Sequence, residues 1–252
     1  MTDAFTRDWQ AWHDRREAAL QEPHGWLSLT ALHWPGDEPE GLDGLPGLWS
    51  AEGAKLTVTA EAAEGLAIDG ESVDGTAVVT APAWIDHGDR RLEIALRGGR
   101  AAVRVRDPQA PTRTGFTGVP AYAIDPAWVV PARFTPEPDT LTVGSVRPGL
   151  EQPLRITGSV AFDLAGEPRR LTAADGGDGR LWLLFRDATN GDTTAGFRQL
   201  TTDAPAADGA VALDFNRALN MPCAFTDHGT CPLPPPGNAL DVPVTAGELA
   251  PR

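Results

Sequence analysis

The stretch that decides the fold spans residues 91–106 and reads Arg91-Leu92-Glu93-Ile94-Ala95-Leu96-Arg97, Gly98-Gly99, Arg100-Ala101-Ala102-Val103-Arg104-Val105-Arg106. Two adjacent glycines can adopt the positive φ angles of a tight hairpin turn. A two-residue loop pairs Ile94 with Val103 on one face and Glu93 with Arg104 on the other. Because the apolar pairs and the Glu–Arg pair agree on one register, the sequence predicts an antiparallel hairpin here.

Strand patterns continue through the rest of the chain. Further strands are expected near residues 26–33, 55–59, 76–81, 128–134, 154–164, 180–186, 194–200 and 211–215. Residues 181–185 are apolar throughout, as expected of a central strand covered on both faces. The 27 glycines and 23 prolines are spread along the chain, which suits many short strands joined by tight turns. The sequence therefore predicts an all-β fold, mostly antiparallel, built as a barrel or a sandwich.

A helix is expected at the start of the chain. Phe5, Trp9, Trp12 and Leu20 fall close to helical spacing, and a Glu-Pro-His-Gly turn at residues 22–25 should end the helix. A length of 252 residues is ordinary for one β sandwich or barrel. We therefore expect an N-terminal helical arm over residues 1–23 and a single β-rich domain over residues 24–252, which includes a Pro-rich C-terminal loop.

Charge and hydropathy limit the classes of partner. The formal net charge is −14 and Lys55 is the only lysine, which works against binding to nucleic acid or to an anionic membrane. The first residues lack the basic start and apolar core of a signal peptide. The longest dense apolar stretch, residues 181–185, is too short to cross a bilayer. A soluble cytoplasmic protein is expected, with no nucleic-acid partner and no membrane partner.

Two predicted strands end in an Arg-Asp pair. They are Arg106-Asp107 and Arg186-Asp187, and Thr189 follows the second pair. Binding groups often project from strand ends into loops, and a guanidinium forms a planar fork for a carboxylate or phosphate. Converging arginines would thus hold a small anionic ligand. The alternative is structural: each aspartate caps a turn and each arginine pairs with an acid inside the protein.

A third group of polar residues lies at Asp214-Phe215-Asn216-Arg217. On an extended strand, Asp214 and Asn216 share one face while Arg217 takes the other. The face with Asp214 and Asn216 would line a pocket or bind a metal through oxygen. Alternatively, these side chains bond the backbone of the C-terminal loop, whose buried groups need partners.

Both cysteines lie near the C-terminal end, in a C-x₄-H-x₂-C arrangement of Cys223, His228 and Cys231. A zinc site would need a fourth ligand and usually takes its donors in closer pairs. A disulfide would close a short loop but is disfavoured in a reducing cytosol. We interpret Cys223 and Cys231 as buried free thiols, with a structural or redox role. No metal is expected because the zinc ligand set is incomplete, and no cofactor is expected because phosphate-loop and dinucleotide-binding motifs are absent. The nucleophile elbow of a Ser-based triad is absent as well.

Several motifs together resemble a family of bacteria and archaea that is catalogued as domain of unknown function 1684. The resemblance runs from Gly25-Trp26-Leu27-Ser28-Leu29-Thr30 to Ala246-Gly247-Glu248. Its landmarks are Arg104-Val105-Arg106-Asp107, Phe185-Arg186-Asp187-Ala188-Thr189, Asp214-Phe215-Asn216-Arg217-Ala218 and Cys231-Pro232-Leu233-Pro234. The resemblance implies kinship and brings no activity with it.

The chain departs from the family pattern at three places. A Thr-Tyr pair of the family is Thr193-Thr194 here, although Arg198 is retained, and a Tyr-Asn-Pro-Pro-Cys run is residues 219–223, Leu-Asn-Met-Pro-Cys. An Asn-Arg-Leu run becomes Asn238-Ala239-Leu240. If either tyrosine or that arginine serves the family's function, this protein has lost that contribution.

The sequence leads to three hypotheses about function. The first is a domain that binds a small anionic molecule through the eight residues Arg106, Asp107, Arg186, Asp187, Thr189, Asp214, Asn216 and Arg217. The second is a hydrolase in which Asp214 acts as base or metal ligand and arginines stabilise developing negative charge. The third is a protein-interaction module that uses the run Pro232 to Pro236 as a stiff docking surface. The sequence specifies neither the ligand nor the oligomeric state.

Overall fold

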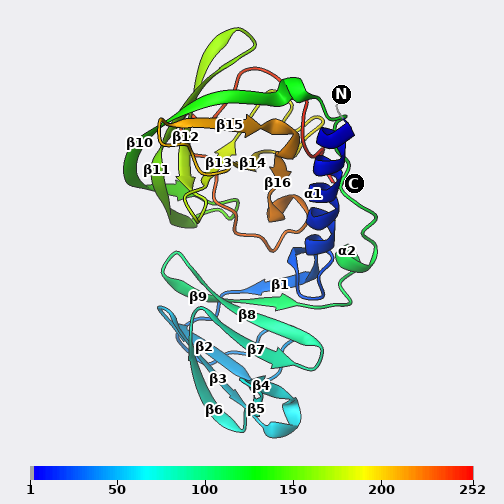
Figure 1. Cartoon of the computed structure of the whole chain (residues 1–252). Coiled ribbons are helices and arrows are strands. Elements are labelled where there is room, and N and C mark those ends of the chain that lie inside the picture. Colours follow the sequence, from blue (N-terminus) through cyan, green and yellow to red (C-terminus); the bar gives the residue numbers. More distant parts are fainter. Residues whose placement is uncertain (1–2, 252) are drawn as a thin grey trace. The chain divides into compact units, whose positions relative to one another are not determined.

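The structure, a computed structural model, describes residues 3–251 (Figure 1). The chain divides into two compact units: unit 1 comprises Met1–Glu17, Thr117–Phe225 and Gly229–Arg252, and unit 2 comprises Ala18–Phe116 and Thr226–His228. The architecture is mostly antiparallel β-sheet with an N-terminal helix, α1 (Asp3–Leu20), which confirms the predicted fold class. The expected division into an arm over 1–23 and one domain over 24–252 stays a prediction, and each unit is described by itself.

Unit 2 contains two antiparallel sheets. A six-stranded sheet has the order β1-β9-β8-β7-β4-β5, and a three-stranded sheet has the order β2-β3-β6. The elements are η1 (Trp26–Ser28), β1 (Leu29–His33), β2 (Leu48–Glu52), β3 (Lys55–Ala60), η2 (Ala62–Glu64), β4 (Leu66–Ile68), β5 (Glu71–Ser72), β6 (Gly75–Thr80), β7 (Ala83–His87), β8 (Arg90–Arg97), β9 (Arg100–Arg106) and α2 (Pro111–Thr114). Trp49 and Leu56 of the small sheet share one buried cluster with Ile85 and Ile94 of the large sheet, so the two sheets pack face to face.

The hairpin of β8 and β9 has the predicted register. Ile94 lies opposite Val103, and Glu93 lies opposite Arg104. The turn residues Gly98 and Gly99 both have positive φ, as a two-residue hairpin loop requires. The inward residues of this hairpin contribute to the core of unit 2.

Unit 1 contains one seven-stranded sheet with the order β15-β10-β11-β12-β13-β14-β16. Its elements, besides most of α1, are η3 (Pro126–Trp128), β10 (Val129–Gly144), β11 (Glu151–Leu164), β12 (Glu167–Asp175), β13 (Leu181–Phe185), β14 (Arg198–Thr201), β15 (Ala210–Asp214), η4 (Phe215–Arg217), β16 (Leu219–Asn220) and η5 (Pro222–Ala224). β13 is covered on both faces: Leu183 and Phe185 belong to one buried cluster, whereas Leu184 belongs to another. This explains why the strand is apolar at every position.

Three strand predictions need correction. Residues 26–28 form a 3₁₀ turn, so the first strand begins at Leu29. The strand expected at 194–200 begins only at Arg198, because the preceding residues belong to a hydrogen-bonded loop. The strand expected at 128–134 continues to Gly144 as β10. Pro136 and Pro138 lie within this strand, and the pairing with β11 shifts register between Pro136 and Asp139 and so accommodates them.

Residues 238–249, called the C-terminal segment below, connect β12 and β13 where these two strands no longer pair with each other. β12 and β13 pair only at Ala174–Trp182 and Asp175–Leu181. Beyond this point the amide of Asn238 accepts a hydrogen bond from Thr172 N and donates to the carbonyl oxygens of Thr172 and Leu184, at 2.8–2.9 Å. Asn238 therefore satisfies backbone groups that the sheet leaves without ladder partners.

Candidate functional site

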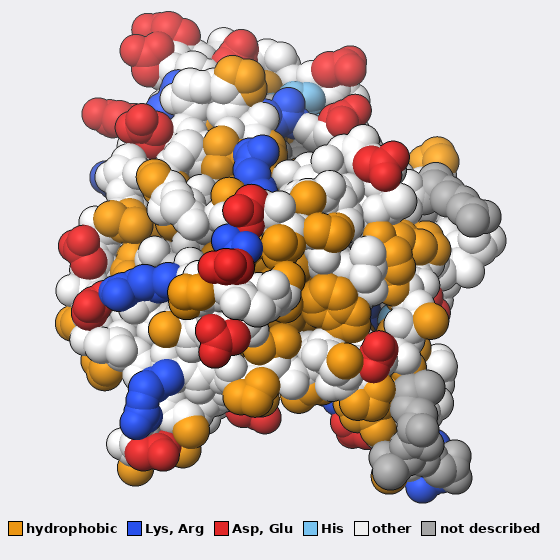
Figure 2. All heavy atoms as spheres, turned by 90° about the horizontal axis from the view of Figure 1, so that it is seen from above, with side chains coloured by type: hydrophobic (Ala, Val, Ile, Leu, Met, Phe, Trp, Pro, Cys, Tyr) orange, Lys and Arg blue, Asp and Glu red, His pale blue; other side chains and the backbone are white. Residues whose placement is uncertain are grey.

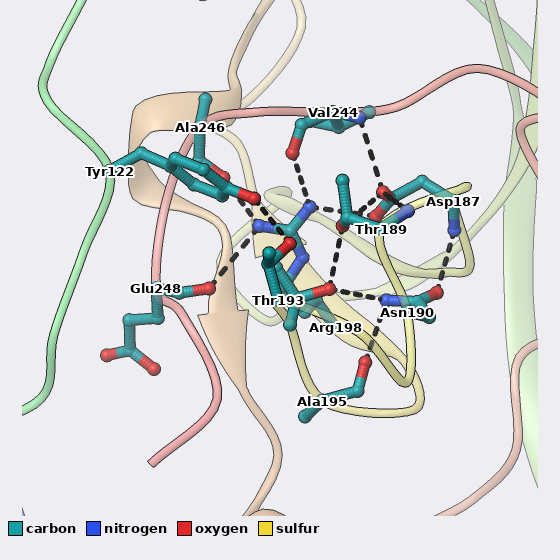
Figure 3. A network of polar contacts seen from close by, with 11 residues as sticks. Tyr122, Asp187, Thr189, Asn190, Thr193, Ala195, Arg198, Val244, Ala246 and Glu248 are labelled. Carbon is teal, nitrogen blue, oxygen red and sulfur yellow. Dashed lines mark hydrogen bonds and ion pairs between the residues drawn. The ribbon is translucent and has the colours of Figure 1, made fainter. Parts of the chain in front are cut away.

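A buried ion pair lies where β13 ends (Figure 3). Asp187 follows β13, and Arg198 is the first residue of β14, which pairs with β13. Nη2 of Arg198 lies 2.8 Å from Oδ2 of Asp187, and both side chains are fully buried. The sequence-predicted residue Asp187 therefore does pair with an arginine, but its partner is Arg198 and not the neighbouring Arg186.

Arg198 also holds the C-terminal segment. Its guanidinium donates to the backbone carbonyl oxygens of Val244, Ala246 and Glu248, as Figure 3 shows. The guanidinium thus contacts four oxygen atoms, one on Asp187 and three on the backbone of the C-terminal segment. These contacts fix the position of residues 244–248 against β14. The cation lies 5.6 Å from the ring centroid of Phe185, which adds a cation–π contact.

The carboxylate of Asp187 is saturated with donors. Its Oδ1 accepts hydrogen bonds from Thr189 N, Thr189 Oγ1 and Val244 N, in addition to the Arg198 contact at Oδ2. Burial alone would raise the pKa of Asp187, but Arg198 and the Thr189 donors outweigh it and hold the pKa below its usual value. Asp187 is therefore an ionised brace at neutral pH, without a proton to transfer.

Thr189 belongs to a hydrogen-bonded loop that links β13 to β14. Its hydroxyl also contacts Thr194 Oγ1 at 2.7 Å, and Asn190 bonds both Thr194 and the carbonyl of Ala195. At the outer edge of the loop, the hydroxyl of Tyr122 lies 2.6 Å from Thr193 Oγ1. The contacts of Asp187 and Thr189 are therefore those of the structural alternative, in which the aspartate caps a turn and pairs with an arginine inside the protein.

A second ion pair, between the partly buried Arg16 and the buried Glu248, fastens α1 to the same C-terminal segment. Nε of Arg16 donates to Oε1 of Glu248 at 3.0 Å, and Oε2 of Glu248 accepts from Asn220 N at 2.7 Å. Asn220 lies directly opposite Arg198 in the pairing of β14 with β16. Sequence reasoning did not select Arg16, Asn220 or Glu248, because their partners lie up to 232 residues away along the chain.

Asp214, Asn216 and Arg217 come together, but not as predicted. Residues 215–217 form a 3₁₀ turn rather than an extended strand, so the expected separation of faces is wrong. Asp214 accepts bonds from Asn216 and Arg217, and Asn216 also bonds the backbone of Asp125 in both directions. Nε1 of Trp9 on α1 donates to the Asn216 carbonyl at 2.9 Å. This cluster anchors α1 and the 3₁₀ turn η3 in unit 1.

Arg106 and Asp107 belong to unit 2. Arg106 donates twice to Glu93 and once each to the carbonyls of His24 and Gly25. Burial would raise the pKa of Glu93, but Arg104 and Arg106 together hold it below its usual value. Asp107 accepts from Gln109 N and so caps a turn. The guanidinium of Arg106 is fully occupied inside this unit.

Arg186 differs from the other candidate arginines because its side chain is exposed. Its backbone N–H bonds the Asn238 carbonyl, and its own carbonyl accepts from Leu240 N. These bonds attach the C-terminal segment to the end of β13. Arg186 thus contributes its backbone to the fold and presents its side chain to solvent.

The two cysteines are free thiols that lie close together. Cys223 N lies 3.4 Å from the sulfur of Cys231. A separate hydrogen bond between the side chains of Cys223 and Cys231, together with burial, strongly raises the pKa of Cys223. Over residues 3–251, the structure contains no group of three or more His, Cys, Asp or Glu side chains that could hold a metal ion.

A depression on unit 1 was not anticipated from the sequence. β10 shifts register between Pro136 and Asp139, and β11 shifts register between Ile156 and Gly158. Beside these paired bulges lies a depression of about 430 Å³. Its lining consists of Glu137, Pro138, Asp139, Leu141, Ile156, Gly158, Ser159, Arg170 and Thr172. Bulges commonly lie next to binding sites because they redirect side chains.

Charges on the molecular surface are mixed. On the face that Figure 2 shows, basic side chains are scattered among more numerous acidic ones and among apolar side chains. No helix within residues 3–251 has the length and apolar character needed to cross a membrane.

The fold and these contacts define a mostly antiparallel β protein in which buried ion pairs fasten its C-terminal segment. The chain belongs to the family described as "Protein of unknown function (DUF1684)", which matches residues 114–249. The predicted family is thereby confirmed, although the match begins far beyond Gly25, where the resemblance was first noted. Of the four landmark motifs, the one at residues 104–107 lies outside the matched range.

Solved structures similar to this chain include the solution NMR structure of an uncharacterized protein from Haloarcula marismortui, with 33% identity over 54% of this chain and 78% of that chain, and a TM-score of 0.45. No curated protein matches the chain.

Proposed function

We propose that the protein is a binding domain for a small molecule that carries an anionic group. The observation that carries this proposal is the depression of about 430 Å³ on unit 1, a volume within the range of small-molecule sites. It combines apolar side chains, Leu141 and Ile156, with the hydroxyl groups of Ser159 and Thr172. Polar groups that converge on a concave site fix the orientation of a bound ligand.

Arg170 is the cation that suits this role. Its side chain is 61% exposed and lines the depression, where it pairs with Glu137. By contrast, the guanidinium of Arg106 is engaged by Glu93 and two carbonyls, and Arg217 is engaged by Asp214 and Asp8. A surface ion pair contributes little stability, so a ligand carboxylate can replace Glu137 at the Arg170 fork at small cost.

The remaining charges narrow the class of ligand. Glu137 and Asp139 place two carboxylates beside one guanidinium, so the lining disfavours a compact, highly charged anion such as phosphate. A ligand with one carboxylate would match Arg170, and hydroxyl or ammonium donors on the same ligand would match Glu137 and Asp139. We therefore propose a small hydroxy acid or amino acid as the ligand class.

Calorimetric titration against separate panels of amino acids, hydroxy acids and inorganic phosphate tests this proposal. Arg170→Ala is expected to weaken binding at least about tenfold, the equivalent of one charge-assisted hydrogen bond. Arg155→Ala is the matched control, because Arg155 is an exposed arginine on β11 that lies outside the depression. Equal weakening by both variants, or no binding by the wild type to any panel, would refute the site.

The hydrolase hypothesis receives no support from the surroundings of Asp214. Three donors from Asn216 and Arg217 occupy its carboxylate oxygens, which is the pattern of a brace rather than of a free base. Asp214→Asn separates the two roles. A bracing role predicts a lower melting temperature, whereas an unchanged melting temperature with loss of turnover in a substrate screen would favour the hydrolase.

The interaction-module hypothesis concerns the run Pro232 to Pro236. Pro232 forms a bridge with Ser145, Leu233 N bonds the Gly144 carbonyl, and Leu233 packs on a buried cluster. Of the five residues in the run, only Pro236 is classed as exposed. A docking role for the run stays a prediction, and the depression is the better-supported site.

A further inference from the structure

The outer strand of the small sheet in unit 2 has an open edge. β6 is the last strand in the order β2-β3-β6 and lies at the border of its sheet in Figure 1. Ala81 N bonds the Ala54 carbonyl, and the register pairs Lys55 with Thr80. In an antiparallel ladder, hydrogen-bonded and non-hydrogen-bonded pairs alternate. The N–H and C=O groups of Thr76, Val78 and Thr80 therefore point away from β3.

These outward groups have no hydrogen-bond partner among residues 3–251. The side chains of the same three residues are exposed, and Val78 is exposed by 59% although it is apolar. Ala77 and Val79 instead pack against the core of unit 2. β6 thus presents both an open backbone edge and an apolar side chain to solvent, the combination that promotes pairing with another strand.

Two other open strand borders, those of β2 and of part of β10, are protected. The outer side of β2 is covered by residues 36–40, since Ala51 N bonds the Gly36 carbonyl and Glu40 bridges Trp49. β10 extends beyond its pairing with β15, but that stretch contains the sequence Pro-Glu-Pro-Asp at residues 136–139. Proline and charge are standard protections against edge pairing. The sequence Gly-Thr-Ala-Val-Val-Thr of β6 contains neither, and its pairing with β3 shows no register shift.

We propose that β6 pairs antiparallel with β6 of a second copy of this chain and so extends the three-stranded sheet across a twofold axis. With the axis at Val78, each copy exchanges two hydrogen bonds at Val78–Val78 and at each Thr76–Thr80 pair. The two valine side chains meet on the exposed face of the sheet. Asp74 then lies opposite Pro82 of the second copy, so the pairing brings no like charges face to face.

A second copy suits this edge better than an unrelated peptide does. The strand is uncharged, whereas the protein carries a net charge of −14, so the edge is a stretch where two acidic copies can approach without repulsion. The pattern Thr-x-Val-x-Thr is symmetric about Val78, which makes the edge complementary to itself. Because a short edge pairing buries little area, the dimer is expected to be weak and concentration-dependent.

Sedimentation equilibrium on the full chain tests the proposal over concentrations up to about 1 mM, the limit of weak association. The wild type is expected to dimerise. Val78→Lys places two ammonium groups opposite each other and is expected to raise the dimer dissociation constant at least about tenfold. Val78→Pro removes the central outward N–H donor without adding charge, and proline is tolerated at such edges.

Leu96→Lys is the matched control, because Leu96 is also an exposed apolar residue of unit 2, at 40%, but lies on β8. It is expected to leave the dimer unchanged. Circular dichroism and thermal melting establish that all three variants remain folded. A monomeric wild type at about 1 mM, or a dimer that survives both Val78 variants, would overturn the proposal.

Discussion

Replacing Arg198 by methionine tests the role of the buried ion pair most directly. The change removes donors to four oxygen atoms, one on Asp187 and three on the backbone of the C-terminal segment. It also leaves the fully buried Asp187 carboxylate without its cation. Breaking such a pair costs about 3–5 kcal/mol, which corresponds to a drop in melting temperature of roughly 6–20 °C for a protein of this size.

The dependence of this loss on pH separates a charge effect from a packing effect. The pKa of Asp187 is lowered in the folded protein, so its contribution to stability is present above its unfolded pKa of about 3.9. That contribution is lost as the pH falls through the lower, folded pKa. The difference in unfolding free energy between wild type and Arg198→Met should therefore be largest near neutral pH and shrink in acid.

Urea unfolding followed by tryptophan fluorescence, repeated from neutral pH downward, measures both quantities. Arg155→Met is the control, because Arg155 is 80% exposed and its surface pair with Asp175 should contribute no more than about 1 kcal/mol. The double variant Asp187→Asn/Arg198→Met should be more stable than the sum of the single losses implies. A loss below about 1 kcal/mol, or one that is constant with pH, would refute a bracing role for the pair.

Three further predictions concern single positions in unit 1. Asn238→Asp should lower the unfolding free energy by at least about 2 kcal/mol, since two buried carbonyls lose their donor; Asp241→Asn, at a carboxylate that is 75% exposed, should have little effect in the same urea titration. Gly158→Ala should cost about 1–3 kcal/mol, because a Cβ there would collide with the backbone carbonyl oxygen of Thr135 and lie 2.7 Å from Cε2 of Phe134. Gly196→Ala, where a Cβ meets nothing within 4 Å, should be tolerated, and similar losses for both glycines would contradict the argument. The raised pKa of Cys223 should make its alkylation by iodoacetamide at neutral pH much slower in folded than in unfolded protein, as followed by intact mass; equal rates would contradict it.

Local pairings were predictable from the sequence, and distant ones were not. The register of β8 and β9 follows from a two-residue loop and short-range pairs, so local chemistry is sufficient to specify it. Arg106 pairs with Glu93 along the diagonal of the same hairpin, a neighbour that the register also provides. The partner of Arg16, by contrast, is Glu248, and a sequence pattern carries no information on such a closure.

The candidate site was predicted in part for the same reason. Asp187 and Thr189 were identified at a strand end, and their mutual contact is local. Arg198 was noted only through the family resemblance, although a charged residue next to the apolar Phe197 was a visible signal. Asn238 gave a weaker signal, because an asparagine after Pro-Pro-Gly is typical of any turn. The depression beside Arg170 depends on two register shifts. The sequence did not indicate them, because the strand was expected to end at residue 134, before Pro136 and Pro138.

The way in which unit 1 is assembled determines when it can fold during synthesis on the ribosome. Unit 2 is drawn almost entirely from residues 18–116, whereas unit 1 needs both α1 and residues beyond 117. Its ion pair between Arg16 and Glu248 joins a segment that precedes residues 18–116 to one that follows them. We therefore expect the sheets of unit 2 to form during synthesis, before the residues of unit 1 that contact α1 have been made. Unit 1 closes only when the C-terminal segment emerges, so truncation before Glu248 should leave it incomplete.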